Sequence, residues 1–219
     1  MAYSIAKARK ARPRQVVTTN GLITFDQFYD LVEENVKAHL LDGKIVRDSP
    51  AIPEHGFTNM WIVTLIHNYN EIFHLGKIGG GNTTVRLAKY QAPEPDIFFI
   101  RNHRLGIVNF KYIDGPPDLC IEVISKSTRR IDRGRKFVLY ADYGVKEYWM
   151  IDPLRGTIEF YENHDGEWTE IKPDAQGRLH SNVLPGLWLK TEWFATYPLP
   201  PVFQVLSEIL GKNVVPSIN

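Results

Sequence analysis

Residues 119–151 of this 219-residue chain read LCIEVISKSTRRIDRGRKFVLYADYGVKEYWMI. The first part, 119–125, is mostly apolar on both faces of a pleat, which is typical of a strand buried inside a sheet. The next stretch, 127–143, opens with hydroxyl residues that can cap a helix, and Gly144 supplies a stop. A second apolar run, 147–151, follows closely. Strand, helix and strand in this order predict a βαβ-like unit at the centre of the fold.

Shorter elements are predicted on both sides of this unit. Helices are expected over residues 25–38, 57–73 and 203–210, and strands over 44–47, 83–87, 96–100, 158–161 and 168–171. Turn signals at Asp152-Pro153 and Asp165-Gly166 predict that the last strands are antiparallel. The glycine-rich segment 76–81 lacks the lysine and hydroxyl residue of a phosphate-binding loop, so we expect a plain loop or bulge. The predicted fold class is α/β, with a mixed sheet.

Composition sets the expected organisation. The chain is 43% hydrophobic, which suffices for one well-packed domain. We expect a basic tail over residues 1–20, one domain over 21–197, and a tail over 198–219 that contains a short amphipathic helix. There is no run of about 18 apolar residues and no apolar stretch of a secretory signal, so we expect no membrane association and a cytoplasmic location.

Two further compositional features bear on partners and chemistry. The single cysteine, Cys120, lies inside an apolar run and is expected to be a small buried hydrophobe. The net charge of +1 neither requires nor excludes a nucleic-acid partner, because a local basic patch can attract phosphate without a basic average.

Glu122 is out of pattern in the apolar strand 119–125. Burying an unpaired carboxylate is costly, so Glu122 should be protonated, paired with a cation, or bound to a metal. A buried pair with an arginine of the following helix is the structural alternative.

Asp96 is a second carboxylate at the start of an apolar strand, with a strand-start turn or cap as its structural alternative. Two carboxylates from neighbouring strands, with backbone carbonyls and water, suit Mg²⁺ or Mn²⁺ better than Zn²⁺. Asp118 competes with Asp96, but it lies about 13 Å from Glu122 along the same strand. We therefore expect Asp96 to be the partner of Glu122, and Asp118 to be a strand-start or turn residue.

A lysine can reach this pair if the predicted helix folds back along the sheet. Glu122 lies about 10 Å before the strand's end and Lys136 about 12 Å into the helix, so the two come level. The alternative for Lys136 is an ordinary surface ion pair with Asp132, four residues earlier. The remaining basic residues of this region are expected to contact a nucleic-acid backbone: Lys126, Arg129, Arg130 and Arg133.

The segments PEPDIFFI (93–100) and PPDLCIEVISKSTRRIDRGRKFVLYADYGVKEYWMIDP (116–153) resemble the Uma2 (DUF820) family of restriction endonucleases. The resemblance extends to Leu41-Asp-Gly-Lys-Ile, to Pro53-Glu-His55 and to Leu184-Pro-Gly-Leu187. It implies a restriction endonuclease-like core of the PD-(D/E)XK class, with a mixed sheet, flanking helices and a C-terminal antiparallel hairpin extension.

The resemblance also implies site roles. Asp96 matches the aspartate of the motif and Glu122 its second acid, and these two with the carbonyl of Val123 would hold Mg²⁺ or Mn²⁺. The usual lysine position is Ile124 here, and Lys136 matches a lysine that has migrated to the following helix. His39 stands where the family commonly has a glutamate.

The function predicted from these features is metal-dependent endonucleolytic hydrolysis of DNA, with Asp96, Glu122 and Lys136 as catalytic residues. Cutting two strands with one site per chain favours a homodimer. The runner-up is a catalytically inactive nucleic-acid-binding or accessory protein of the same fold. A third alternative is a structural protein in which Glu122 merely pairs with Arg129 or Arg133.

Overall fold

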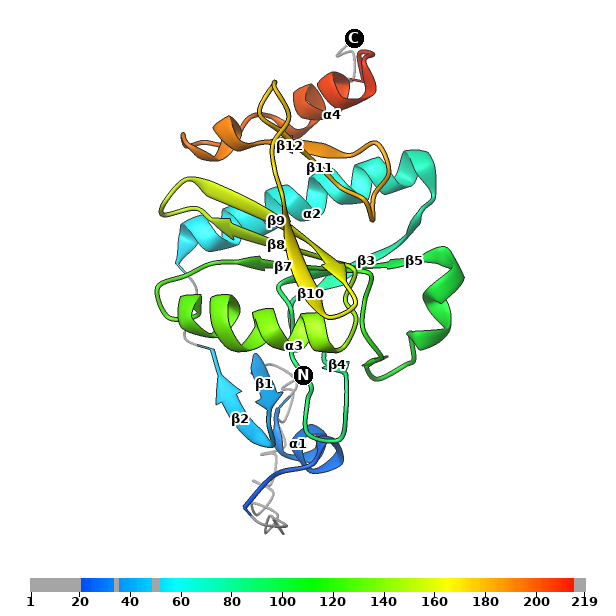
Figure 1. The fold of residues 1–219 in the computed structure, drawn as a ribbon, viewed down its shortest axis with the longest axis vertical. Coiled ribbons are helices and arrows are strands. Elements are labelled where there is room, and N and C mark those ends of the chain that lie inside the picture. Colours follow the sequence, from blue (N-terminus) through cyan, green and yellow to red (C-terminus); the bar gives the residue numbers. More distant parts are fainter. Residues whose placement is uncertain (1–20, 34–35, 49–51, 215–219) are drawn as a thin grey trace, which may run out of the picture.

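The computed structural model describes residues 21–33, 36–48 and 52–214, so the basic tail expected over 1–20 lies outside the described residues. A six-stranded mixed sheet in the order β10-β9-β8-β7-β5-β3 forms the centre of the fold (Figure 1). Its strands are β3 (Gly76–Gly80), β5 (Ile97–Arg101), β7 (Leu119–Val123), β8 (Glu147–Asp152), β9 (Thr157–His164) and β10 (Glu167–Ile171). β7 and β8 are parallel and the other neighbours are antiparallel, which confirms the predicted βαβ-like unit and the antiparallel late strands.

Helices cover both faces of this sheet (Figure 1). On one face lies α2 (Pro53–Phe73), which begins four residues before the predicted start because Pro53 fits the first helical turn. The same side carries the hairpin β11 (Arg178–His180) and β12 (Trp188–Lys190), the 3₁₀ turn η3 (Thr191–Phe194) and α4 (Val202–Leu210). The larger apolar core lies between α2 and the sheet and includes Leu65, Phe99 and Trp149.

The opposite face is covered by the helix that follows β7. It contains a π-helical turn, η2 (Ile131–Lys136), and continues as α3 (Phe137–Asp142). A smaller core here includes Cys120, Tyr140 and Tyr148. The buried, apolar setting of Cys120 agrees with its expected role as a small hydrophobe.

The N-terminal part forms a separate layer on the α3 side of the sheet (Figure 1). Thr24 caps α1 (Phe25–Leu31) through a capping box with Gln27. The prediction that this helix continues to residue 38 is wrong, because it ends at Leu31 and the chain forms the hairpin β1 (Ala38–Leu41) and β2 (Lys44–Arg47). Backbone hydrogen bonds between Leu40 and Ala92 hold the hairpin in place.

The glycine-rich segment is a strand, β3, and the expected loop there is wrong. A Cβ on Gly76 would lie 2.1 Å from the carbonyl oxygen of Ile100, and one on Gly80 would lie 2.2 Å from that of Asp96. The glycines therefore let β3 approach β5 closely.

The remaining elements are short: the 3₁₀ turn η1 (Asn102–Ile107) and the parallel pair β4 (Val85–Arg86) and β6 (Ile113–Asp114). Within the described ranges, no helix combines the length and apolar character needed to cross a bilayer.

Candidate metal and phosphodiester site

Asp96 and Glu122 lie beside each other at the junction of β5 and β7. The antiparallel register pairs Ile97 with Ile121, so the residue before β5 stands across from Glu122. Oδ2 of Asp96 accepts the backbone N–H of Val123 at 2.8 Å. Asp96 and Glu122 are 5% and 1% exposed. The structure thus brings together the two acids that the sequence singled out.

Lys136 reaches Glu122 from η2, the helical turn that covers the α3 side of the sheet. Its ammonium nitrogen is 2.9 Å from Oε1 of Glu122 and 3.2 Å from Oδ1 of Asp132. Tyr140 also donates a hydrogen bond to Oε1 of Glu122, at 2.9 Å. The pair with Asp132 therefore exists, but it is buried rather than on the surface.

The arginines of the same helix pair elsewhere. Arg129 contacts Asp152 at 2.6 Å, and Arg133 contacts Glu159 at 2.5 Å. The alternative in which Glu122 pairs with Arg129 or Arg133 is therefore wrong, because Lys136 occupies that position.

Glu122, Asp132 and Lys136 form one titrating unit. Burial raises the pKa of Glu122 to about 8 despite the charge of Lys136, and burial also raises the pKa of Asp132. Burial lowers the pKa of Lys136, but the charges of Glu122 and Asp132 outweigh it and hold that pKa above its ordinary value. Near neutral pH the unit therefore holds two protons, one on Lys136 and one shared by the two carboxylates. A cation bound at Glu122 would release the shared proton.

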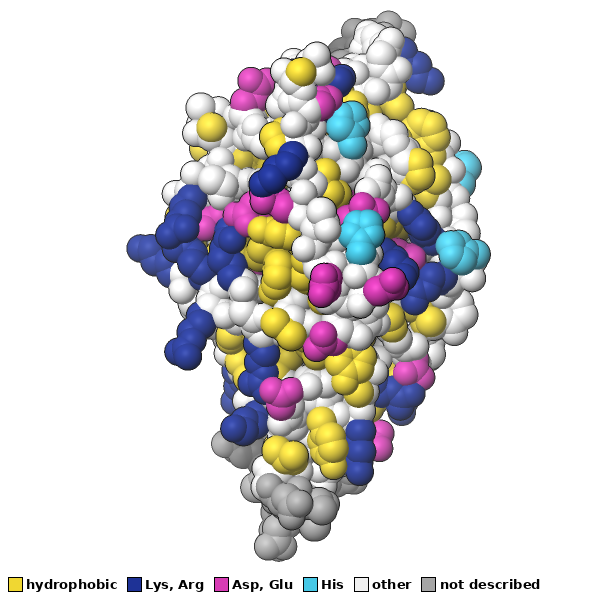
Figure 2. Space-filling model, in the orientation of Figure 1, with side chains coloured by type: hydrophobic (Ala, Val, Ile, Leu, Met, Phe, Trp, Pro, Cys, Tyr) yellow, Lys and Arg dark blue, Asp and Glu magenta, His cyan; other side chains and the backbone are white. Residues whose placement is uncertain are grey.

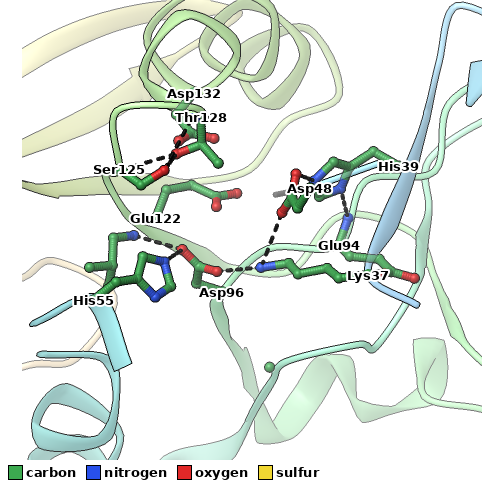
Figure 3. A network of polar contacts seen from close by, with 12 residues as sticks. Lys37, His39, Asp48, His55, Glu94, Asp96, Glu122, Ser125, Thr128 and Asp132 are labelled. Carbon is green, nitrogen blue, oxygen red and sulfur yellow. Dashed lines mark hydrogen bonds and ion pairs between the residues drawn. The ribbon is translucent and has the colours of Figure 1, made fainter. Parts of the chain in front are cut away.

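Asp96 has two further partners that the sequence did not indicate as site residues (Figure 3). Lys37, in the segment just before β1, contacts Oδ1 of Asp96 through its ammonium group. His55, in the first turn of α2, places Nε2 3.2 Å from Oδ2. Burial raises the pKa of Asp96, but the hydrogen bond from His55 and the charge of Lys37 outweigh it, so its pKa lies well below the ordinary value. Asp96 is therefore an ionised carboxylate. The only sequence signal for His55 was the resemblance at residues 53–55, and nothing local pointed to Lys37.

His39 supports the site without entering it. The ring is fully buried, and burial lowers its pKa to about 4, so it is neutral at physiological pH. Nδ1 accepts the backbone N–H of Glu94 at 2.9 Å, which leaves the proton on Nε2. Nε2 then donates to Oδ1 of Asp48 at 3.1 Å. Asp48 is in turn 3.8 Å from the ammonium of Lys37, so position 39 orients a neighbouring carboxylate toward the site.

The donor set fits a hard divalent cation. Among the residues that the structure describes, no three His, Cys, Asp or Glu side chains converge to hold a metal by themselves. Mg²⁺ commonly takes only one or two carboxylates and completes its shell with water and phosphate oxygens. Four acids share this region with two lysines: Asp48, Asp96, Glu122 and Asp132 against Lys37 and Lys136. The acids outnumber the lysines, which favours binding of a cation.

The remaining predicted residues lie near the end of β7. Lys126 and Arg130 are exposed, and neither forms an ion pair with the described part of the chain, in contrast to Arg129 and Arg133. Figure 2 shows Lys and Arg side chains gathered at the edge where β7 and β8 end. Asp118 is at the opposite end of β7, where it accepts the N–H of Arg101 at 2.9 Å and pairs with Arg104. Its expected role as a strand-start residue agrees with these contacts.

Comparisons with known proteins show the family and the fold of this chain. Residues 25–192 match the model of the Uma2 family, described as "Putative restriction endonuclease". A Synechocystis protein, "Uncharacterized protein slr1290", is 26% identical over 148 residues, which cover 65% of this chain and 75% of that protein. The crystal structure of a "putative nuclease belonging to DUF820" from Anabaena variabilis superposes with a TM-score of 0.66 at 20% identity. That match covers 79% of this chain and 97% of the Anabaena chain, and it shows that the mixed α/β fold is shared.

Proposed function

Because the chain belongs to the Uma2 family, we propose that it is an endonuclease that hydrolyses DNA phosphodiester bonds with a divalent metal ion. The observation that carries the proposal is the placement of ionised Asp96 on the backbone N–H of Val123, directly beside the acid of β7. Burying two carboxylates beside each other costs folding free energy, so folding alone does not explain why these two strands bring them together.

The proposed roles follow from the contacts. Asp96, Glu122 and the carbonyl of Val123 would hold Mg²⁺ or Mn²⁺, which supplies a charge that polarises phosphate and lowers the pKa of water. His55 fixes the direction of the Asp96 carboxylate, and Lys136 and Tyr140 fix that of Glu122. Lys136 is the lysine that the sequence predicts as catalytic, and its contact with Oε1 of Glu122 at 2.9 Å keeps it at the site.

The basic edge would bind the DNA backbone. Lys126 and Arg130 are the better candidates for phosphate contacts, because Arg129 and Arg133 are engaged by Asp152 and Glu159. Replacing Arg130 with alanine should weaken DNA binding and reduce the salt slope of affinity by about 1. An unchanged slope in a titration against salt would remove Arg130 from the interface.

The direct test is cleavage of plasmid DNA in Mg²⁺ or Mn²⁺ by wild type and Asp96→Ala. We expect wild type to cleave and the variant to lose at least about 100-fold in rate, because it loses a carboxylate of the site. Asp114→Ala, which changes an exposed aspartate paired with Arg86 on the surface, is the matched control and should keep full activity. An Asp96→Ala protein that cleaves plasmid DNA as fast as wild type would contradict the assignment.

One observation favours the runner-up, a protein of this family that binds nucleic acid without cleaving it. Both acids have lysine partners, Asp96 with Lys37 and Glu122 with Lys136. Calorimetry separates the two functions, since the nuclease must bind Mn²⁺ at millimolar concentration and the runner-up need not. We also propose that the active form is a homodimer, which sedimentation at micromolar concentration can test.

A further inference from the structure

The two lysines of the site differ in how far they can reach. Lys136 is 1% exposed, and two buried carboxylates hold its ammonium within 3.2 Å. The side chain of Lys37 is 22% exposed, and its ammonium contacts Asp96 and lies 3.8 Å from Asp48. Lys136 is therefore enclosed by the protein, whereas Lys37 is both in the site and accessible to solvent.

A phosphodiester that approaches this site is stabilised by an accessible cation in addition to the metal ion. The carboxylates of Asp48 and Asp96 repel an anion, and the charge of Lys136 is already engaged by its two acids. Figure 3 shows Lys37 and His55 on two sides of Asp96, with the lysine side chain extended toward the acid. Once Asp96 serves a metal ion, the ammonium of Lys37 loses its nearest anionic partner. A phosphate oxygen is the group that can replace it.

We propose that Lys37 is a catalytic residue that contacts the scissile phosphate, and that Lys136 is a positioning residue that holds Glu122. This inference rests on the proposed nuclease function. In the hydrolysis, the oxygen of water bonds to phosphorus while the bond from phosphorus to one sugar oxygen breaks. The products are a phosphomonoester and an alcohol: one proton of the water goes to the leaving sugar oxygen, and the other remains with the phosphomonoester. Lys37 keeps its proton throughout and stabilises the negative charge that grows on the non-bridging oxygens.

The test compares Lys37→Met, Lys37→Gln and Lys37→Arg with wild type. Lys37→Gln keeps a hydrogen-bond donor for Asp96 and removes the charge, so it serves if the methionine variant is poorly folded. Lys44→Met is the matched control, because Lys44 is an exposed lysine of β2, in the hairpin that directly follows Lys37. The readouts are kcat and KM for DNA cleavage, together with the Kd for Mn²⁺ by calorimetry.

We expect kcat to fall about 100-fold in Lys37→Met and Lys37→Gln with KM little changed, and Lys37→Arg to recover most of the rate. The Kd for Mn²⁺ should stay the same or decrease in the two neutral variants, because an ammonium that competes for Asp96 has been removed. Lys44→Met should match wild type in every readout.

Three results would overturn the inference. Neutral variants that cleave as fast as wild type would remove Lys37 from catalysis and leave the proposed function standing. Loss of Mn²⁺ binding in the neutral variants would mean that Lys37 only keeps Asp96 in place. A folded wild-type protein that binds Mn²⁺ and cleaves no DNA would defeat the proposed function, and this inference with it.

Discussion

Glu122 and Glu147 are both buried acids in the two parallel central strands, and they are satisfied in opposite ways. Glu147 lies on the α2 side of the sheet, and its donors in the described part of the chain are all neutral: the indole of Trp149, the hydroxyl of Ser181, and the backbone N–H groups of Asn182 and Val183. Glu122 lies on the α3 side and faces an ammonium, a tyrosine hydroxyl and another carboxylate. The hydrogen bonds of Glu147 fasten the loop at residues 181–183 to the sheet.

The difference shows how a structural acid can be told from a functional one. Neutral donors fill the hydrogen-bonding capacity of Glu147 and leave nothing for a ligand to improve. At Glu122, two acids and one lysine share protons, so a cation can replace a proton and lower the repulsion between the acids. Burial alone does not separate the two cases, because Glu147 and Glu122 are 0% and 1% exposed.

The largest expected effect is on activity at Glu122. Glu122→Gln should lower DNA cleavage about 1000-fold, equivalent to about 4 kcal/mol, because a neutral amide is a poor metal ligand. The variant keeps an acceptor for Lys136 and Tyr140, so its free energy of unfolding should stay within about 1 kcal/mol of wild type. Plasmid cleavage and urea denaturation measure the two quantities. The opposite outcome, lost stability with full activity, would make Glu122 a structural acid like Glu147.

The next effect is on stability at Glu147. Glu147→Ala leaves four donors without their acceptor, three of them buried, and should lower the free energy of unfolding by about 3 kcal/mol. Glu147→Gln retains one acceptor oxygen and should lose about half as much. The activity of the folded fraction should remain that of wild type in both variants. A Glu147→Ala protein that unfolds at the same urea concentration as wild type would show that Glu147 is not a structural acid, and would contradict the comparison with Glu122.

The smallest effect is the pH dependence of stability. The folded-state pKa of Glu122 is raised from 4.5 to about 8, so its contribution to stability is complete below pH 4.5 and is lost as pH rises through 8. Wild type should therefore lose stability relative to Glu122→Gln as pH rises from 5 to 8. Saturating Mn²⁺ should reduce this loss in wild type, because the ion takes the place of the proton. Parallel pH profiles of wild type and Glu122→Gln, measured by urea denaturation, would contradict the shared proton.

The central unit of the fold could be predicted because its signals are local and agree with each other. The apolar runs around Glu122 and Glu147 are too hydrophobic for an edge strand of the sheet. Gly144 ends the helix before the second run begins. The same reasoning failed at β3, where glycines disfavour a strand and only the close approach of β5 explains them. It failed again after α1, since the segment that follows Leu31 carries no stop signal.

From the sequence, Asp96 was chosen as the partner of Glu122 because Asp118 lies too far along the strand and because of the family resemblance. Lys136 was chosen from the helix length. Register sets Asp96 across from Glu122, and the length of the helix sets Lys136 level with it. Lys37 and His55 come from elements 59 and 41 residues before Asp96 in the chain. No local pattern reports such contacts, because they depend on how the hairpin and α2 dock on the sheet.

The position of Lys136 on a helix has a consequence for how relatives of this chain diverge. A sequence pattern that requires a lysine two places after the acid would pass over this protein, although an ammonium stands 2.9 Å from that acid. Strand register pins the acids to fixed places in the sequence, but several positions on the covering helix can deliver a long side chain to the same point. During evolution the lysine can therefore move along the chain without leaving the site, while the two acids cannot.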